Sequence, residues 1–229
     1  LASGLIYRFG IDVHYKNLAR SAVWFKRASA IDTLTSFRLK QNREFFLAVF
    51  RSETDADVKY RIVRGLSLLV RDLDDLTVVM RLMSSLPYLT AKYTEDVFFN
   101  EITALKLAGR EDDFGAFMRA IMDDAAVHPL VKRDCLSACH AAACERALPI
   151  VREYYDHFQR EPEVLVACVK SLVRMGDFGV LPRAMRHPDW RVRLTALKYA
   201  ELSTEDLLPA LKDLLGDRNY HIRVNAALA

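Results

Sequence analysis

Apolar residues follow the period of an α-helix over most of this chain. Val58, Ile62 and Leu66 are four residues apart, and the same spacing joins Ile222 to Ala226, so each set shares one helix face. The sequence has no Asn-Gly or Asp-Gly pair between alternating runs, the usual sign of a β-hairpin. The pattern predicts an all-α protein.

The start of this pattern repeats along the chain, and each start is an apolar residue, usually valine. Successive starts are 28 to 39 residues apart, at Val58, Val97, Val131, Val164, Val192 and Ile222. Repeats of this length are typical of stacked helical hairpins, in which each hairpin contacts mainly its neighbours. We therefore expect a right-handed α-α superhelix, or solenoid, of about six hairpins.

Proline and glycine positions set the expected hairpin boundaries. Prolines such as Pro182 fall early in expected first helices, and glycines such as Gly176 follow apolar stretches, where they can end a helix. The expected hairpins span residues 42–71, 74–109, 112–144, 146–175, 178–202 and 205–229. One or two helices over 12–40 precede them. The predicted domains are a basic N-terminal segment, 1–41, and a repeat domain, 42–229.

The two final hairpins share a motif in which an aspartate precedes an apolar-Arg pair and a small residue. These positions are Asp189, Val192, Arg193 and Ala196, and then Asp217, Ile222, Arg223 and Ala226. Over 178–229 the sequence resembles HEAT-like repeats of the bacterial kind, which also occur in the phycobilin-lyase group. The match is looser over 42–175, and residues 1–40 do not resemble the repeat. The resemblance implies an α-solenoid but no particular activity, because such repeats serve many functions.

The motif also has a local physical reason. An aspartate at the start of the second helix can accept backbone N–H bonds there. The arginine can extend along the apolar surface and pair with an acidic turn of the neighbouring hairpin. We therefore interpret Arg193 and Arg223 as structural residues.

Charge is distributed unevenly along the chain. The net charge is +3, of which residues 1–43 carry +6 and the remainder −3. A basic segment of this kind favours an anionic membrane surface or an acidic partner, with Arg20, Lys26 and Arg27 as the expected contacts. A membrane helix preceding Leu1 would place this segment on the cytoplasmic side.

No catalytic, cofactor or metal site is predicted. Cys135, Cys139, His140 and Cys144 lie close in sequence, but they lack the paired spacing of a structural zinc site. We interpret these cysteines as small core residues in a reducing compartment. The glycines are too dispersed for a phosphate-binding loop.

Basic residues recur six positions after several of the repeat starts, where the side chain turns away from the apolar face. These are Arg64, Lys170 and Lys198, and Lys106 and Lys132 add to the set. A solenoid presents its second helices on a concave binding face. The expected function is therefore a non-catalytic scaffold for another protein, acting as the cytosolic part of a larger, membrane-associated bacterial protein.

Two other functions stay open. One is nucleic-acid binding, which the charge of −3 over 44–229 makes unlikely because a duplex requires many phosphate contacts. The other is a lyase-like chaperone for a bilin or another small ligand, which requires a deep apolar pocket.

Overall fold

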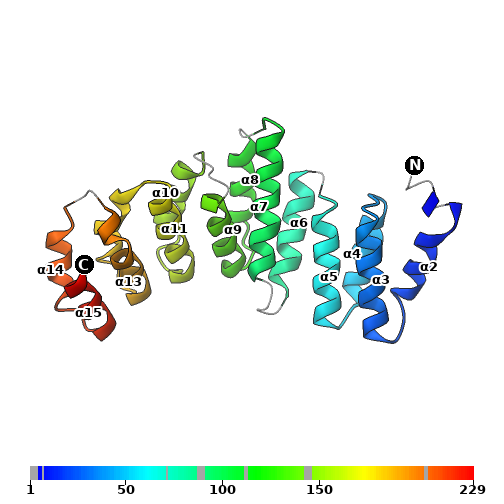
Figure 1. Cartoon of the computed structure of the whole chain (residues 1–229), viewed down its shortest axis with the longest axis horizontal. Helices are drawn as coiled ribbons and strands as arrows, with labels where there is room; N and C mark the ends of the chain where they lie inside the picture. Colours follow the sequence, from blue (N-terminus) through cyan, green and yellow to red (C-terminus); the bar gives the residue numbers. More distant parts are fainter. Residues whose placement is uncertain are drawn as a thin grey trace. The chain divides into compact units, whose positions relative to one another are not determined.

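The structure is a computed structural model that consists of helices. It describes the chain except for residues 1–4, 7, 71, 87–90, 111–112, 142–145 and 204–205. No strand occurs in the described part, so the predicted all-α class is confirmed. The chain divides into two compact units, Leu1–Val97 (unit 1) and Phe98–Ala229 (unit 2), both drawn in Figure 1.

Unit 1 is built around helix α5. Its helices are α2 (Ile11–Leu18), α3 (Trp24–Ser36), α4 (Asn42–Ser52), α5 (Ala56–Ser67), α6 (Leu73–Ser84) and the first part of α7 (Ala91–Leu107). Helix α5 contacts α3, α4 and α6, and α2 packs on α3. Helix α3, which precedes the expected domain boundary after residue 41, packs against α5 of the first expected hairpin.

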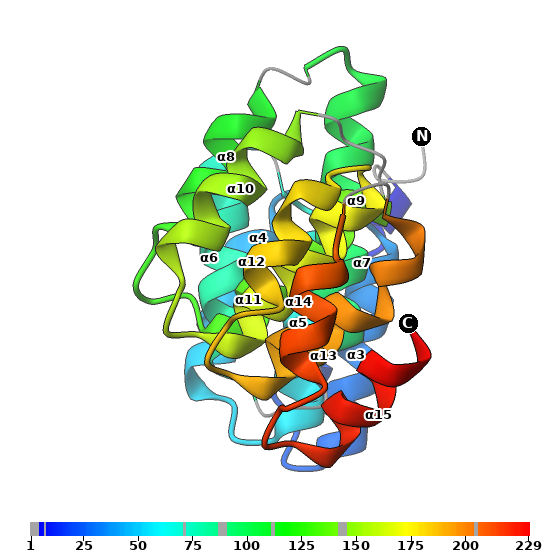
Figure 2. The same cartoon turned by 90° about the vertical axis from the view of Figure 1, so that its left-hand side faces the viewer.

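Unit 2 continues with pairs of helices. After the remainder of α7 come α8 (Phe114–Met122), α9 (Pro129–Ala141), α10 (Ala147–His157), α11 (Pro162–Arg174), α12 (Leu181–Ala184), α13 (Trp190–Lys198), α14 (Leu208–Leu214) and α15 (Tyr220–Leu228). Short 3-10 helices, η3 (Phe178–Val180) and η4 (Ala200–Leu202), precede α12 and follow α13. The second helices pack in series, α9 on α11, α11 on α13 and α13 on α15. Figure 2 shows α13 and α15 side by side.

In the described part of the chain, each expected hairpin corresponds to two α-helices, from the pair α4 and α5 to the pair α14 and α15. The six apolar residues that mark the repeat starts are all buried, and Val58, Val164, Val192 and Ile222 are fully so. The periodicity therefore identified the face of each second helix that enters the core.

The motif of the final hairpins forms a link between them. The Asp189 carboxylate accepts the Arg191 N–H at the start of α13, as expected of a helix cap. The Arg193 guanidinium donates to both carboxylate oxygens of Asp217, at 2.7 and 3.0 Å. Asp217 itself does not cap α15. It accepts the N–H of Asn219, and the Asn219 side chain caps the helix through the His221 N–H.

One glycine marks a close approach between helices in unit 1. A Cβ atom on Gly65 of α5 would lie 2.5 Å from Thr35 Oγ1 and 2.9 Å from Phe46 Cε2. Both of those side chains come from helices that pack on α5. The absence of a side chain at Gly65 therefore allows these helices to meet.

Candidate interaction surfaces

Most of the basic positions predicted on second helices are exposed. Arg64 lies on α5, Lys106 on α7, Lys170 on α11 and Lys198 on α13, and each is accessible to solvent. Arg64 belongs to unit 1 and the other three to unit 2. Lys170 and Lys198 lie on helices that contact each other directly.

Lys132 differs from this expectation because it is buried. Lys132 is only 7% exposed, and its Nζ lies 5.1 Å from the centroid of the Phe158 ring. Burial lowers the pKa of Lys132, and nearby Glu161 opposes the shift. Lys132 is the fourth residue of α9, as Arg193 is of α13, and this position points into the structure. It does not belong to the exposed surface.

Lys170 and Lys198 occupy equivalent positions, each the ninth residue of its helix. Neither makes an ion pair with the described residues. One turn earlier on each helix lies a partly exposed apolar side chain, Val166 on α11 and Leu194 on α13. Adjacent helices therefore offer two cations beside two apolar side chains, and we call these four residues the second-helix surface.

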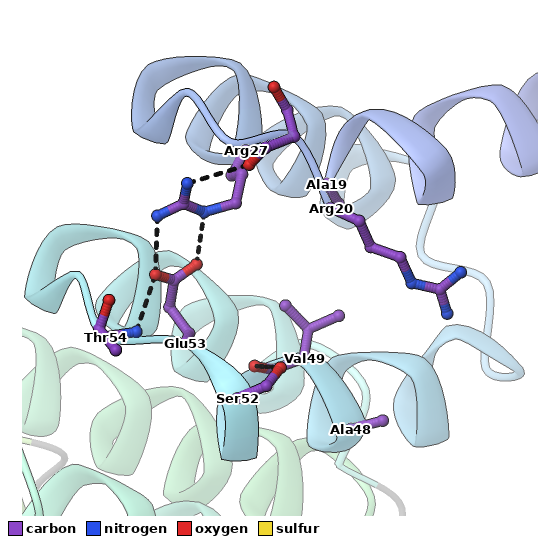
Figure 3. Close-up of a pocket in the computed structure, with 9 residues that line it drawn as sticks. Ala19, Arg20, Arg27, Ala48, Val49, Ser52, Glu53 and Thr54 are labelled. Atoms are coloured by element: carbon purple, nitrogen blue, oxygen red, sulfur yellow. Dashed lines mark hydrogen bonds and ion pairs between the residues drawn. The ribbon is translucent and has the colours of Figure 1, made fainter.

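Arg27 is held inside unit 1 and does not face solvent freely. Its guanidinium donates to both carboxylate oxygens of Glu53, at 2.7 and 2.9 Å, as Figure 3 shows. It also donates to the carbonyl oxygens of Ser21 and Ala22, both at 3.0 Å. With these bonds Arg27 links α3 to the turn after α4. This role differs from the predicted contact with a membrane or acidic partner.

The Glu53 carboxylate completes this link. Its side chain is only 3% exposed, and it accepts the N–H groups of Thr54 and Asp55 as well as Arg27. Burial raises the pKa of Glu53, but the hydrogen bonds from Arg27 and the two N–H groups outweigh it and hold the pKa below its usual value. The carboxylate therefore stays ionised at neutral pH.

A pocket of about 470 Å³ lies beside this pair. It is lined by Ala19, Arg20, Ser21, Arg27, Ala48, Val49, Ser52, Glu53 and Thr54. The Arg20 side chain points away from the Arg27–Glu53 pair in Figure 3, and its guanidinium lies 5.5 Å from the Phe45 ring centroid. A second pocket of about 330 Å³ in unit 2 is lined by the ion pairs Arg152–Asp177 and Arg183–Asp156. Neither is the deep apolar pocket that the small-ligand function requires.

The turn that enters α3 exposes a feature that the sequence analysis did not single out. Arg20 and Lys26 are exposed there as expected, and between them Val23, Trp24 and Phe25 are exposed as well. We call Val23, Trp24 and Phe25 the α3 tip. An apolar run between two basic residues was the available signal in the sequence.

Burial raises the pKa of several titratable groups among the described residues of unit 2. Cys135, Cys139 and Cys168 are buried free thiols, and burial raises the pKa of Cys135 and of Cys168. Burial also raises the pKa of Glu101 on α7 to about 7. No three side chains able to hold a metal ion lie together in the described part. Cys144 and the His140 side chain fall outside it.

None of the described helices combines the length and apolar character needed to cross a membrane. Comparison with protein-family models, with curated proteins and with solved structures finds no match to this chain. The resemblance to HEAT-like repeats therefore depends on the residues of the two final hairpins.

Proposed function

We propose that this chain is a non-catalytic scaffold that binds a protein partner through the second-helix surface of unit 2. One observation carries the proposal. Lys170 and Lys198 lie exposed at equivalent positions of α11 and α13, two helices in direct contact, and neither pairs with an acidic group in the part of the chain that the structure describes. Exposed cations repeated on adjacent helices favour a partner with acidic groups at a matching spacing.

The proposal includes the stacking of hairpins as a HEAT-like, right-handed superhelix whose second helices line the concave face. The serial packing of α9, α11, α13 and α15 and the Arg193–Asp217 link support it. The buried free thiols support a reducing compartment. In this proposal the scaffold acts in the cytoplasm as part of a larger bacterial protein at the inner face of a membrane.

The residues of the surface define the chemistry of the partner. Val166 and Leu194 lie four residues before Lys170 and Lys198, so each helix presents an apolar side chain next to a cation. An amphipathic segment with an apolar stripe bordered by Asp or Glu complements both features. The apolar contacts supply affinity, and the acidic groups fix orientation and accelerate association.

A photo-crosslinking residue in place of Leu194 identifies the partner in cells, and the same residue in place of Lys212 on α14 serves as control. The purified partner is then titrated against Lys170→Glu plus Lys198→Glu. We expect binding to weaken about tenfold or more, because two attractive contacts become repulsive.

The matched control is Lys212→Glu plus Arg218→Glu, which makes the same change of charge at exposed residues away from the second-helix surface. We expect it to leave the affinity almost unchanged at physiological salt. Equal weakening by both pairs of substitutions would show a general charge effect and would rule out this surface as the binding site.

A further inference from the structure

The α3 tip places three apolar side chains in solvent at consecutive positions. Val23 is 37% exposed, Trp24 49% and Phe25 56%. The Trp24 and Phe25 rings meet edge to face, with centroids 6.2 Å apart and planes at 88°. Consecutive residues of a helix point about 100° apart, so these side chains spread around the start of α3 and form no single stripe.

The corresponding turns of unit 2 show which part of this feature is specific to α3. Helix α13 begins with Asp189-Trp190-Arg191 at the same three positions, and α15 with Asn219-Tyr220-His221. Trp190 and Tyr220 are also exposed, at 44% and 64%. An exposed aromatic first residue is therefore shared by all three helices. The additional apolar residues on either side occur in α3 and not in the other two.

The surroundings of the tip are basic. Arg20 and Lys26 are exposed and make no ion pair with the described residues. The acidic residues of segment 1–43 are Asp12 and Asp32, and each is engaged in an ion pair of its own. The Arg20 guanidinium packs over the Phe45 ring, and no carboxylate of the described residues neutralises Arg20 or Lys26.

The tip is also held in a fixed position. The bonds from Arg27 to the carbonyls of Ser21 and Ala22 and to Glu53 fasten the turn to the end of α4. The Ser21 hydroxyl accepts the Val23 N–H at 3.2 Å. A turn fixed in this way loses little conformational freedom on binding.

We infer that the α3 tip is a docking site for an anionic lipid bilayer. Val23, Trp24 and Phe25 enter the interfacial region, and Arg20 and Lys26 contact the headgroup phosphates. Tryptophan and phenylalanine flanked by cations are the residues that partition into this region. A fluid interface surrounds spread side chains from all directions, whereas a rigid acidic protein surface covers only some of them. The inference concerns unit 1 and is independent of partner binding by unit 2.

Trp24 can report on its own insertion. The chain has two tryptophans, so Trp190→Phe leaves Trp24 as the single tryptophan. We expect its emission to shift to the blue, and to be quenched by lipid-borne quenchers, on phosphatidylcholine vesicles that contain phosphatidylserine. Pure phosphatidylcholine vesicles are expected to give a much smaller response, because the contribution of the basic residues is lost. Absence of a shift on the anionic vesicles would overturn the inference.

Two variants in this background separate the apolar and charged contributions. Val23→Asp plus Phe25→Arg reproduces the start of α13, keeps Trp24 and Arg27, and leaves the net charge unchanged. We expect its partitioning onto anionic vesicles to fall about tenfold or more. Arg20→Gln plus Lys26→Gln keeps the apolar tip, and we expect about tenfold weaker binding and little preference for anionic lipid.

The matched control is Tyr220→Ala, which removes the exposed aromatic from the corresponding position of α15 and is expected to leave vesicle binding unchanged. Circular dichroism and urea unfolding establish that each variant is folded. Undiminished binding by the folded Val23→Asp plus Phe25→Arg variant would overturn the inference. A Trp24 response to soluble polyglutamate but not to vesicles would also overturn it, and would assign the tip to an acidic polypeptide.

Discussion

The turns that enter α3 and α13 share a framework and differ in surface. In each, an arginine at the fourth position of the helix donates to two carbonyl oxygens of the preceding turn. The same guanidinium donates to a carboxylate in the turn between the two helices of a later hairpin, Glu53 for Arg27 and Asp217 for Arg193. We call each of these arrangements an arginine clamp.

The exposed residues of the two turns have different chemistry. Helix α13 starts with an aspartate cap, a tryptophan and an arginine, whereas α3 starts with Val23, Trp24 and Phe25. The Val23 backbone has φ −89° and ψ 116°, close to the −78° and 126° of Asp189, so both turns accommodate a capping residue. The clamp therefore sets the geometry of the turn, and the exposed side chains are free to serve a surface function.

The largest effect is expected from removal of a clamp carboxylate. Glu53→Ala leaves the Arg27 guanidinium without its anion and the N–H groups of Thr54 and Asp55 without an acceptor, so we expect a loss of about 3 kcal/mol in the stability of unit 1. Asp217→Ala leaves one backbone N–H group without an acceptor, where Glu53→Ala leaves two. We therefore expect the stability of unit 2 to fall by about 2 kcal/mol. Urea unfolding, followed through Trp24 in a Trp190→Phe background and through Trp190 in a Trp24→Phe background, measures each unit separately.

Glu44→Ala provides the control, because Glu44 is an exposed carboxylate of the same unit, 79% accessible, whose bond to Arg43 is a surface contact. We expect it to cost at most about 0.5 kcal/mol. A Glu53→Ala variant no less stable than Glu44→Ala would refute the structural role of the clamp.

The next effect compares a glycine of each unit. Gly65→Ala forces a Cβ atom against Thr35 and Phe46, and we expect unit 1 to lose about 2 kcal/mol even though alanine favours a helix. Gly115→Ala in α8 places its Cβ 3.7 Å from Ile150 Cδ1, an ordinary contact, so we expect unit 2 to gain up to about 1 kcal/mol. The midpoints of urea unfolding test both signs, and a stabilising Gly65→Ala would contradict the close packing of α3 and α4 on α5.

The sequence was sufficient to predict the helices because its information about them is local. Apolar spacing located the buried face of each second helix, as the buried Val58 and Val192 show. The pairing of Arg193 with an acidic turn was also predictable, because the motif occurs twice within 178–229.

The clamp of α3 was not predicted, and Arg27 was assigned to an external partner instead. Its carboxylate lies 26 residues away and is a glutamate, and its turn lacks the aspartate that marked the later repeats. The signal available was positional, since Arg27 and Arg193 each follow the helix cap by four residues. The burial of Lys132 was not predicted for a related reason. Lys132 is also the fourth residue of its helix, and its side chain packs over the Phe158 ring, whereas its charge alone suggested exposure.

The clamps also predict how stability depends on pH. The pKa of Glu53 and that of Asp217 are lower in the folded state than their usual values, so the folded chain binds fewer protons than the unfolded chain at acidic pH. Their stabilisation is complete above the unfolded pKa and is lost as the pH falls through the folded pKa. We expect the stabilisation from each clamp to fall by roughly 1.4 kcal/mol for each pH unit by which folding lowers the pKa of its carboxylate. Urea unfolding between about pH 6 and pH 3 measures this loss.

Glu53→Gln tests the assignment. We expect it to flatten the dependence of stability on pH for unit 1 and to leave that of unit 2 unchanged. An unaltered slope in unit 1 would contradict the assignment.

The smallest effect is expected from exchange of the residues that precede the two helices. Val23→Asp provides α3 with a carboxylate that can accept the Phe25 N–H, as Asp189 accepts that of Arg191, and we expect unit 1 to gain about 1 kcal/mol. Asp189→Val removes the cap and the bonds to Arg191, and we expect unit 2 to lose about 1 kcal/mol. Opposite shifts of similar size in the two urea midpoints would show that the turns are interchangeable in framework. If Val23→Asp destabilised unit 1 instead, the apolar residue would be required for the fold of the turn, and its exposure would no longer indicate a surface function.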